Sequence, residues 1–361
     1  MNAWSTIVRR RTMWGALALG GWAVLASAGT VIGPAVPAPG EFRQDAVLVG
    51  VASSGTGVVA VGERGTVVLS DNGRAPWRHA TTPTDVTLTA VRFATPLKGW
   101  AIGHAGVVLV TIDGGKTWTR QLDGQAAARL VLAAAGPAQS SEGEEQRRRR
   151  ELARQLVEDG PDKPFLDLYV VDEDTVMVVG AYNLAFRTTD GGKHWVPWQD
   201  RIPNPKSLHL YGVAGAGRDL YIAGEKGTLL HSADGGESFG TLQSPYSGTF
   251  FGVLVQPDGS VIAYGLRGNS YRSADRGASW SKLALDTTAS ITGGTNLGDG
   301  RVALVTQAGE LFISRQGQPD AFTRAGTDRS QPFAGAVRQG AILVLVGARG
   351  TSTAQAPDGT Q

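Results

Sequence analysis

Short apolar stretches alternate along most of this chain with turns rich in glycine and polar residues. The clearest set lies at residues 88–93, 99–102, 107–110 and 118–121. Apolar and polar residues alternate over 88–93, which is typical of a strand that buries one face. Because the intervening turns are short, we predict four strands joined as consecutive hairpins.

One turn motif recurs between the third and fourth strands of such sets. It reads Ser or Thr, any residue, Asp, any residue, Gly, any residue, usually Ser or Thr, then an aromatic, and it occupies residues 111–118, 188–195, 232–239 and 273–280. Ser, Thr and Asp side chains bond nearby backbone N–H groups and fix a turn. Gly supplies the positive φ of a tight hairpin, and the aromatic has the area to pack between neighbouring hairpins. The motif therefore predicts a self-capped hairpin.

The spacing of the motif predicts how the hairpins assemble. Its Asp residues are separated by 77, 44 and 41 positions, so the first interval is about one period plus an insertion. A period of roughly 40–45 residues with several short strands is typical of propeller blades, whereas a β-sandwich shows no such self-similarity. We predict an all-β β-propeller over residues 42–354, with seven blades of four antiparallel strands; six blades is the alternative.

The two ends of the repeat are expected to close the ring. Apolar stretches at 333–337 and 341–346 look like the first strands of a seventh blade, and residues 42–46 would supply its fourth strand. Such closure removes the exposed edges of an open array of sheets. The motif is degenerate at Asp71-Asn72-Gly73, with Trp77 as its aromatic, and has decayed at 314–317.

An insertion at residues 122–163 interrupts the repeat between blades two and three. Residues 125–135 are rich in Ala and Leu, and residues 144–158 are densely charged with one narrow apolar stripe. Both stretches have helical composition. An excursion of this length exceeds an ordinary propeller loop, so we predict a helical insertion.

The N-terminus has the features of a secretory signal peptide at residues 1–28. Arg9, Arg10 and Arg11 precede an apolar run, and Ala26-Ser27-Ala28 forms an A-x-A cleavage site. An uncleaved inner-membrane anchor is the alternative. Residues 29–41 are rich in Pro, Gly and Ala and predict a linker, and residues 355–361 predict a disordered tail.

Composition excludes several classes of chemistry. The 361 residues include no cysteine, which excludes disulfides, thiolate metal sites, Cys nucleophiles and a lipid-modified Cys. The formal net charge is +2, and −1 without the first 28 residues. A nearly neutral chain gives no support to nucleic-acid binding.

The repeat resembles the BNR, or Asp-box, family of propellers, and within it the photosystem II stability/assembly factor family, which has bacterial members without a photosystem. The resemblance rests on a Gly-x-x-Gly turn, an apolar strand and then the Asp box. It is seen at 103–106 before 107–110 and at 224–227 before 228–230, and it covers about residues 42–353. It implies a propeller that binds partner proteins, with a basic patch used by the assembly factors.

The predicted turns between strands two and three would surround one mouth of the central channel. They contain Arg64, His104, Asn183, Lys226, Arg267, Ala308 and Arg349, most of them basic or His. The insertion should emerge on the same face and bring a basic run with it, formed by Arg147, Arg148, Arg149 and Arg150. This face would recognise an acidic or carboxylate-bearing partner segment. Alternatively, the turn residues are only solvated, partly cancelled by Glu63 and Glu225, and the arginine run only pairs with acids along its own helix.

The Asp boxes predict structure rather than chemistry, because their repetition around a rim argues against a single active site. The residues concerned are Asp113, Asp190, Asp234 and Asp275, with the aromatics Trp118, Trp195, Phe239 and Trp280. Sialidase-like glycosidases also carry Asp boxes and are the enzymatic alternative. They need three arginines, a Tyr nucleophile with a Glu partner and an Asp acid, and no such set can be assembled from the spacing. In that family an Arg-Ile-Pro motif precedes the first box. Here it occurs at 201–203, after the third box counted from the degenerate one in blade one, which indicates a chance match.

The sequence therefore predicts a non-enzymatic protein-binding scaffold that is exported to the periplasm. We expect it to assist assembly or stability of a membrane protein complex, with a transporter as one candidate partner. We also expect it to be monomeric, and peripheral association with the membrane is compatible with this role. Neither a cofactor nor a metal is expected, because the five His residues show no ligand spacing and no dinucleotide or P-loop fingerprint is present.

Overall fold

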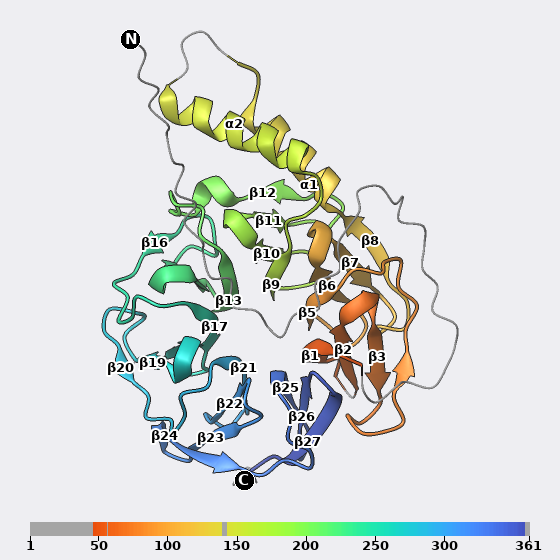
Figure 1. Cartoon of the computed structure of the whole chain (residues 1–361), viewed down its shortest axis with the longest axis vertical. Coiled ribbons are helices and arrows are strands. Elements are labelled where there is room, and N and C mark those ends of the chain that lie inside the picture. Colours follow the sequence, from red (N-terminus) through yellow and green to blue (C-terminus); the bar gives the residue numbers. More distant parts are fainter. Residues whose placement is uncertain (1–45, 56, 139–142, 358–361) are drawn as a thin grey trace, which may run out of the picture. The chain divides into compact units, whose positions relative to one another are not determined.

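Seven antiparallel sheets are arranged radially around a common centre, with the first strand of each sheet innermost (Figure 1). The computed structural model describes residues 46–55, 57–138 and 143–357. The described residues all belong to one compact unit. The innermost strands contact one another in sequence, and the last contacts the first, so the ring is closed.

Each of the first six blades has four strands in simple up-and-down order. Blades one to three consist of β1 (Leu48–Ser53), β2 (Val58–Gly62), β3 (Val67–Ser70) and β4 (Arg78–His79); β5 (Leu88–Phe93), β6 (Gly99–Gly103), β7 (Val108–Thr111) and β8 (Thr119–Leu122); and β9 (Phe165–Val170), β10 (Val176–Gly180), β11 (Ala185–Thr188) and β12 (Val196–Pro197). Blades four to six consist of β13 (Leu210–Ala216), β14 (Asp219–Gly224), β15 (Leu229–Ser232) and β16 (Gly240–Thr241); β17 (Phe250–Val255), β18 (Val261–Gly265), β19 (Ser270–Ser273) and β20 (Ser281–Lys282); and β21 (Ile291–Asn296), β22 (Val302–Thr306), β23 (Leu311–Arg315) and β24 (Gln318–Ala325).

The seventh blade shows three strands within the described residues: β25 (Phe333–Gln339), β26 (Ile342–Gly347) and β27 (Gly350–Gln355). The prediction of seven blades is confirmed, and the six-bladed alternative is wrong. Most of the segment predicted as the fourth strand, residues 42–45, lies outside the described residues, and Ala46 is not in a strand. On the outer edge of β27, Asp328 donates its backbone N–H to the Thr353 carbonyl and accepts a bond from the Thr353 N–H.

The second strand of every blade is buried along nearly its whole length, because it lies between two neighbouring blades. β2, β6, β10, β18 and β22 are buried at every position, which explains their continuous apolar sequences. Seven apolar clusters result, one between each pair of adjacent blades. The cluster between blades seven and one joins Val344 and Val346 to Leu48 and Val58, so the closing contact has a core like the others.

A glycine ends the second strand in six of the seven blades, and close backbone approach explains it. A Cβ added at Gly62 would lie 2.0 Å from the Val47 carbonyl oxygen, and one at Gly180 would lie 2.2 Å from that of Pro164. The equivalent strand in blade six ends at Thr306. Glycine is therefore required where the end of the second strand approaches the backbone that leads into the first strand of the same blade.

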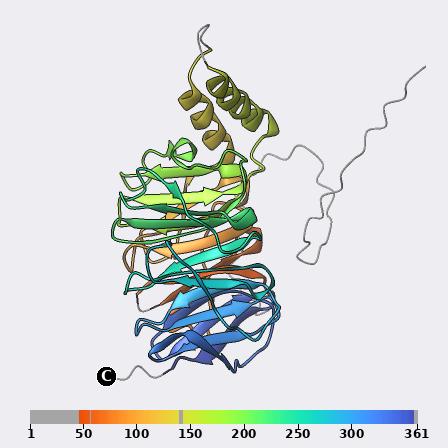
Figure 2. The same ribbon diagram turned by 90° about the vertical axis from the view of Figure 1, so that its left-hand side faces the viewer.

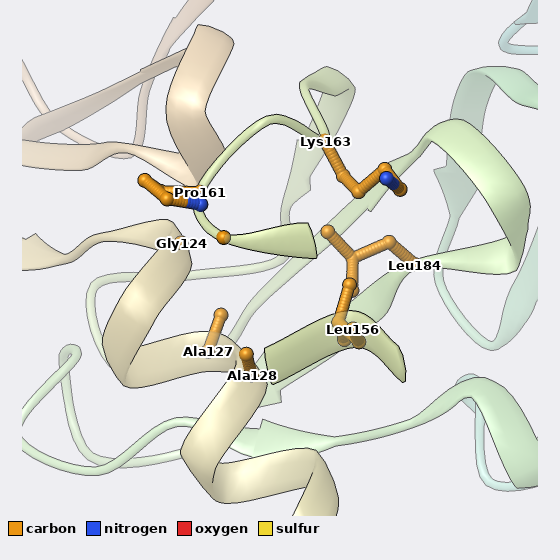
Figure 3. A pocket seen from close by; sticks show the side chains of 8 residues that line it. Gly124, Ala127, Ala128, Leu156, Pro161, Lys163 and Leu184 are labelled. Atoms are coloured by element: carbon orange, nitrogen blue, oxygen red, sulfur yellow. The ribbon is translucent and has the colours of Figure 1, made fainter. Parts of the chain in front are cut away.

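The predicted helical insertion is present as two helices, α1 (Gly124–Ala135) and α2 (Glu144–Asp159). The side chain of Asp123 caps α1 by accepting the Ala126 N–H at 2.9 Å. The hairpin extends outward beyond β12 at the edge of the ring (Figures 1 and 2), and α1 contacts β12. Where it meets blade three, an apolar pocket of about 10 Å³ lies between Ala128, Leu156 and Leu184 (Figure 3). The insertion thus shares part of its core with blades two and three.

The chain ends lie partly outside the described residues. The predicted signal peptide at 1–28 and linker at 29–41 fall there, as do residues 358–361 of the predicted tail. β27 continues to Gln355, and Ala356 is buried and donates its N–H to the Ala341 carbonyl. Within residues 46–55, 57–138 and 143–357, no helix has the length and apolar character needed to cross a membrane.

Candidate interaction face

The turns between the second and third strands lie on one face of the ring, here called the turn face. In the first five blades the turn is a single 3-10 turn: Glu63–Gly65, His104–Gly106, Ala181–Asn183, Glu225–Gly227 and Leu266–Gly268. Its middle residue has a left-handed backbone in each case, with φ between 51° and 58°, and these residues are Arg64, Ala105, Tyr182, Lys226 and Arg267. The left-handed residue occupies the same position in each turn, so the equivalents of Arg64 in blades two and three are Ala105 and Tyr182, not His104 and Asn183.

The basic residues predicted for this face are exposed on it. We call Arg64, His104, Lys226, Arg267 and Arg349 the basic turn residues, and all five side chains are exposed. They come from blades one, two, four, five and seven, so they are distributed around the ring rather than gathered at one point. Glu63 is exposed beside Arg64, whereas Glu225 accepts the backbone N–H of His209 at 2.9 Å. The turn face is thus predominantly but not uniformly basic at these positions.

The basic run on the insertion does not join this set. Arg150 is buried, with 7% of its surface exposed, and donates to the Pro137 carbonyl. Arg149 pairs with Glu145 at 2.6 Å and with Asp200 at 3.5 Å. Arg148 donates to the Pro205 carbonyl. Arg148, Arg149 and Arg150 thus contact the segment after α1, their own helix and the connection from blade three to blade four, and none of these contacts is with the basic turn residues. A role of the run in partner binding stays a prediction.

Inside the basic turn residues, each innermost strand has a β-bulge at its turn-face end. The register shift leaves one unpaired residue per blade: Val49, Thr89, Leu166, Tyr211, Phe251, Thr292 and Ala334. All seven are half-buried. The hydroxyl of Thr89 reaches the Phe165 carbonyl of the next blade at 2.8 Å, and that of Thr292 reaches Phe333 at 2.7 Å. Bulges re-aim side chains, and here they bring Thr89, Thr292 and Tyr211 into contact with the neighbouring blade.

The bulge residues of blades four and five, Tyr211 and Phe251, are aromatic, and with Tyr182 and His209 they form an aromatic arc on blades three to five. The Tyr182 ring lies 4.5 Å from that of His209, His209 lies 6.0 Å from Tyr211, and Tyr211 meets Phe251 edge to face at 5.6 Å. We call these four residues the aromatic arc. Tyr182 is 58% exposed and carries Lys163 above its ring at 5.3 Å.

Sequence reasoning missed this arc, although a signal for it exists. Each innermost strand begins with an apolar residue, a variable residue and then usually Gly, as in Leu210-Tyr211-Gly212 and Phe250-Phe251-Gly252. The glycines allow adjacent strands to approach, since a Cβ on Gly212 would lie 2.7 Å from the Gly252 Cα. The variable middle residue is the one at the mouth, and it could have been read from this second repeat.

The opposite face carries the Asp boxes, and we call it the box face. In blade two, Asp113 accepts bonds from the Thr111 hydroxyl, the Thr117 N–H and the Thr117 hydroxyl at 2.8, 3.0 and 2.6 Å. The same pattern holds for Asp234 with Ser232 and Ser238 and for Asp275 with Ser273 and Ser279. In blade three, Nδ1 of His194 replaces the hydroxyl, 2.6 Å from Asp190. Each carboxylate is therefore occupied in closing its own turn.

The hydrogen bonds lower the pKa of the box carboxylates. Hydroxyl and amide donors from Ser279 and Ser273 lower the pKa of Asp275 to about 2. The His194 amide and ring lower that of Asp190, and the hydroxyls of Ser238 and Ser232 lower that of Asp234. A general acid needs a raised pKa near the working pH, so these carboxylates are unsuited to that role.

Between the box-face ends of the innermost strands lies a cavity of about 260 Å³ within the channel. Arg92 reaches Asp167 there at 3.2 Å, and Asp167 also accepts the Val213 N–H at 3.0 Å. Burial raises the pKa of Asp167, against the opposing effect of Arg92. This pair joins the walls of blades two, three and four.

The arginine of the Arg-Ile-Pro motif lies away from this channel. Arg201 stacks on Trp198 at 4.6 Å and approaches Glu237 of blade four at 3.5 Å. Arg187 stacks on the same ring at 5.0 Å and pairs with Glu237 at 2.6 Å. Arg201 therefore ties two blades together, and the structure gives the sialidase alternative no arginine cluster from this motif. Among the described residues, no group of three or more His, Cys, Asp or Glu side chains is placed to hold a metal ion.

Comparison with known proteins agrees with the fold and identifies the family. The solved structure "YCF48 bound to D1 peptide" is 15% identical with a TM-score of 0.62 and covers 90% of this chain and 100% of that one. "YCF48 from Cyanidioschyzon merolae" is 14% identical with a TM-score of 0.60 and covers 90% and 99%. The TM-scores show that both structures share the propeller fold of this chain.

Sequence comparison extends this to family membership. The "Photosystem II assembly lipoprotein Ycf48" of Synechococcus sp. (strain CC9902) is 26% identical over 151 residues, which is 41% of this chain and 45% of that relative. The matched part therefore spans less than half of the relative's length. A family model described as "Photosynthesis system II assembly factor YCF48" matches residues 69–136 and 149–356. The chain belongs to this family of photosystem II assembly factors.

Proposed function

We propose that this protein is a non-enzymatic assembly factor that holds an acidic segment of a membrane-protein subunit against its turn face while a complex is being assembled. The observation that carries the proposal is the distribution of four exposed cationic side chains, those of Arg64, Lys226, Arg267 and Arg349, on one face of a closed propeller. Burial lowers the pKa of the fifth basic turn residue, His104. Basic surfaces of this kind steer and retain carboxylate-bearing partners. Family membership and the peptide named for one solved relative support a protein segment as the ligand.

The curated relative is named for photosystem II assembly, and we propose that the present chain serves a related membrane complex, with a transporter as one candidate. The protein would act as a monomer. Its enzymatic alternative, a sialidase-like hydrolase, has no observation in its favour, since the box carboxylates are engaged in turns and Arg201 is engaged between blades.

Location outside the cytoplasm is part of the same proposal. The Arg9–Arg11 run, the apolar segment and the Ala26-Ser27-Ala28 site support export, and the relative is named a lipoprotein. With no cysteine to carry a lipid, this chain would reach the periplasm through signal cleavage. Intact-mass measurement of protein from the periplasm should give an N-terminus at Gly29, whereas a mature protein that begins at Met1 would favour the anchor.

The test reverses charge on one face at a time. The turn-face variant replaces Arg64, Lys226, Arg267 and Arg349 with Asp. The first three have a left-handed backbone, which Asp tolerates. The control variant makes the same four charge changes in the box-face turns, at Arg74, Lys116, Lys193 and Arg315, all exposed. Affinity-tagged proteins are used to capture membrane subunits from detergent-solubilised membranes, which are then identified by mass spectrometry.

Capture of a membrane-protein subunit by the wild type and the control variant, but not by the turn-face variant, is the expected result. Both variants should keep the thermal transition of the wild type, because the substituted side chains are exposed. Equal capture by all three proteins would refute the basic turn face as the binding surface.

A further inference from the structure

Aromatic residues are unevenly distributed around the channel mouth on the turn face, and the repeat does not require this asymmetry. The bulge position holds an aromatic residue only in blades four and five, where it is Tyr211 and Phe251. In the other five blades it holds Val49, Thr89, Leu166, Thr292 and Ala334. Since five blades close without an aromatic residue there, packing of the ring does not demand one. The aromatic side chains concentrate apolar surface on one side of the mouth.

Tyr182 extends this surface at a conformational cost. Its φ is 54°, a left-handed backbone that bulky side chains rarely adopt, and the equivalent residues in other blades include Ala105 and the flexible Lys226. Tyr182 is 58% exposed, so burial of its ring does not offset the energetic cost of this backbone conformation. Residues held in sparsely populated backbone conformations cluster at active sites and ligand-binding sites, which favours a binding role for this ring.

Charge around the arc favours an acidic ligand. Lys226 and Arg267 are exposed on the turns of the same blades that carry Tyr211 and Phe251. The nearby acid Glu225 already accepts the His209 N–H and lies 4.0 Å from His209 Nε2. A segment that lies across blades three to five therefore meets aromatic faces on its inner side and basic side chains at its outer side.

We propose that the aromatic arc docks an extended peptide segment in which a proline or aliphatic side chain lies next to carboxylates. The apolar side chain packs against Tyr182, Tyr211 and Phe251, while the carboxylates approach Lys226 and Arg267. This inference rests on the proposed function and narrows it: blades three to five select the partner, and the other basic turn residues supply only general attraction. Rigid aromatic anchors of this kind carry much of the energy of a typical interface.

The test uses three short synthetic peptides with a fluorescent label, measured by anisotropy against the mature chain. The first alternates Glu with Leu and Pro, the second keeps Glu but replaces Leu and Pro with Ser and Gly, and the third keeps Leu and Pro but replaces Glu with Gln. The arc variant combines Tyr211→Thr and Phe251→Thr, since Thr occupies the same bulge in blades two and six. A matched control, Ile112→Thr, removes an apolar side chain that is 73% exposed on the box face.

The wild type and the control should bind the acidic–apolar peptide most tightly. The arc variant should lose about tenfold or more in affinity for that peptide while its weaker binding of the acidic–polar peptide is unchanged. A single variant, Tyr182→Asn, should also lower the affinity for the acidic–apolar peptide. Because Tyr182 does not lie at a bulge, this variant tests the arc even if the double variant at the bulges folds poorly.

Several outcomes would overturn the inference, and they separate it from the proposed function. In one outcome, the arc variant binds like the wild type while the turn-face charge variant loses affinity for both acidic peptides. The arc then does not select the ligand, but the proposed function stands. If the neutral apolar peptide binds as tightly as the acidic–apolar one, the occupant is not acidic. If no peptide binds the wild type, or if the turn-face charge variant binds all of them unchanged, both proposals fail.

Discussion

The two faces of this propeller follow opposite rules. On the box face, four blades repeat the same side-chain hydrogen bonds, and even the His194 substitution preserves the contact to Asp190. On the turn face, the backbone repeats with φ near 55°, but the residue at that position changes from Arg to Ala, Tyr and Lys. A constant backbone with constant side chains maintains the ring. A constant backbone with changing side chains leaves room for a specific partner.

The comparison predicts that box-face residues determine stability and turn-face residues determine binding. Sequence repetition alone would have drawn attention to the box face, because its acids look like a catalytic set. The structure shows that the informative positions are those at which the repeat is broken: Tyr182 among the turns, and Tyr211 and Phe251 among the bulges.

The largest effect should come from the box aromatics. Trp118 is 4% exposed, lies in the cluster between blades one and two, and donates its ring N–H to the Gly115 carbonyl at 2.9 Å. We expect Trp118→Ala to cost about 3–5 kcal/mol in the free energy of unfolding, measured by urea denaturation. Peptide affinity of the fraction that remains folded should be unchanged. A cost below about 1 kcal/mol would mean that the boxes do not hold neighbouring blades together.

The sequence predicted the ring well because its determinants are local. The box motif specifies a turn through contacts within a few residues, as in Asp113 with Thr111 and Thr117, and its period sets the blade. The positions of α1 and α2 were also predictable from composition. The sequence did not predict that Arg150 is buried. Its burial depends on how the helical hairpin packs, and no local sequence pattern contains that information.

The aromatic arc was hidden for a related reason. Tyr211 and Phe251 lie in strands whose apolar residues all look like core, and only the bulge separates a residue at the mouth from one between blades. A one-residue shift of register exchanges the two faces of a strand, and such shifts are visible only once the pairing partners are known.

An intermediate effect should appear as a pH dependence of the box face. Asp275 has a pKa of about 2 in the folded protein against an ordinary 3.8, because Ser279 and Ser273 donate hydrogen bonds to its charged form. A group whose pKa falls on folding contributes stability that is complete above its unfolded pKa and is lost as pH falls through the folded pKa. Thermal unfolding should therefore shift to lower temperature as the pH is lowered from about 4 to about 2.

The matched variants sharpen this dependence. Asp275→Asn should flatten the decline over that pH window, since one titrating carboxylate has been removed from the box face. Asp85→Asn makes the same chemical change at an exposed site between blades one and two on the turn face, and it should leave the wild-type profile in place. Identical profiles for the two variants would show that the box carboxylates do not couple protonation to folding.

The smallest effect on stability should come from the residue that matters most for the proposed ligand. Tyr182→Asn removes a ring that is 58% exposed and its contact with Lys163, which at an exposed site is worth about 0.5–1 kcal/mol. Asn tolerates the left-handed backbone better than Tyr, which offsets that loss. The free energy of unfolding should therefore change by no more than about 0.5 kcal/mol, while affinity for the acidic–apolar peptide falls. A loss of stability comparable with that of Trp118→Ala would place Tyr182 in the core of the ring, and the distinction between the two faces would no longer hold at blade three.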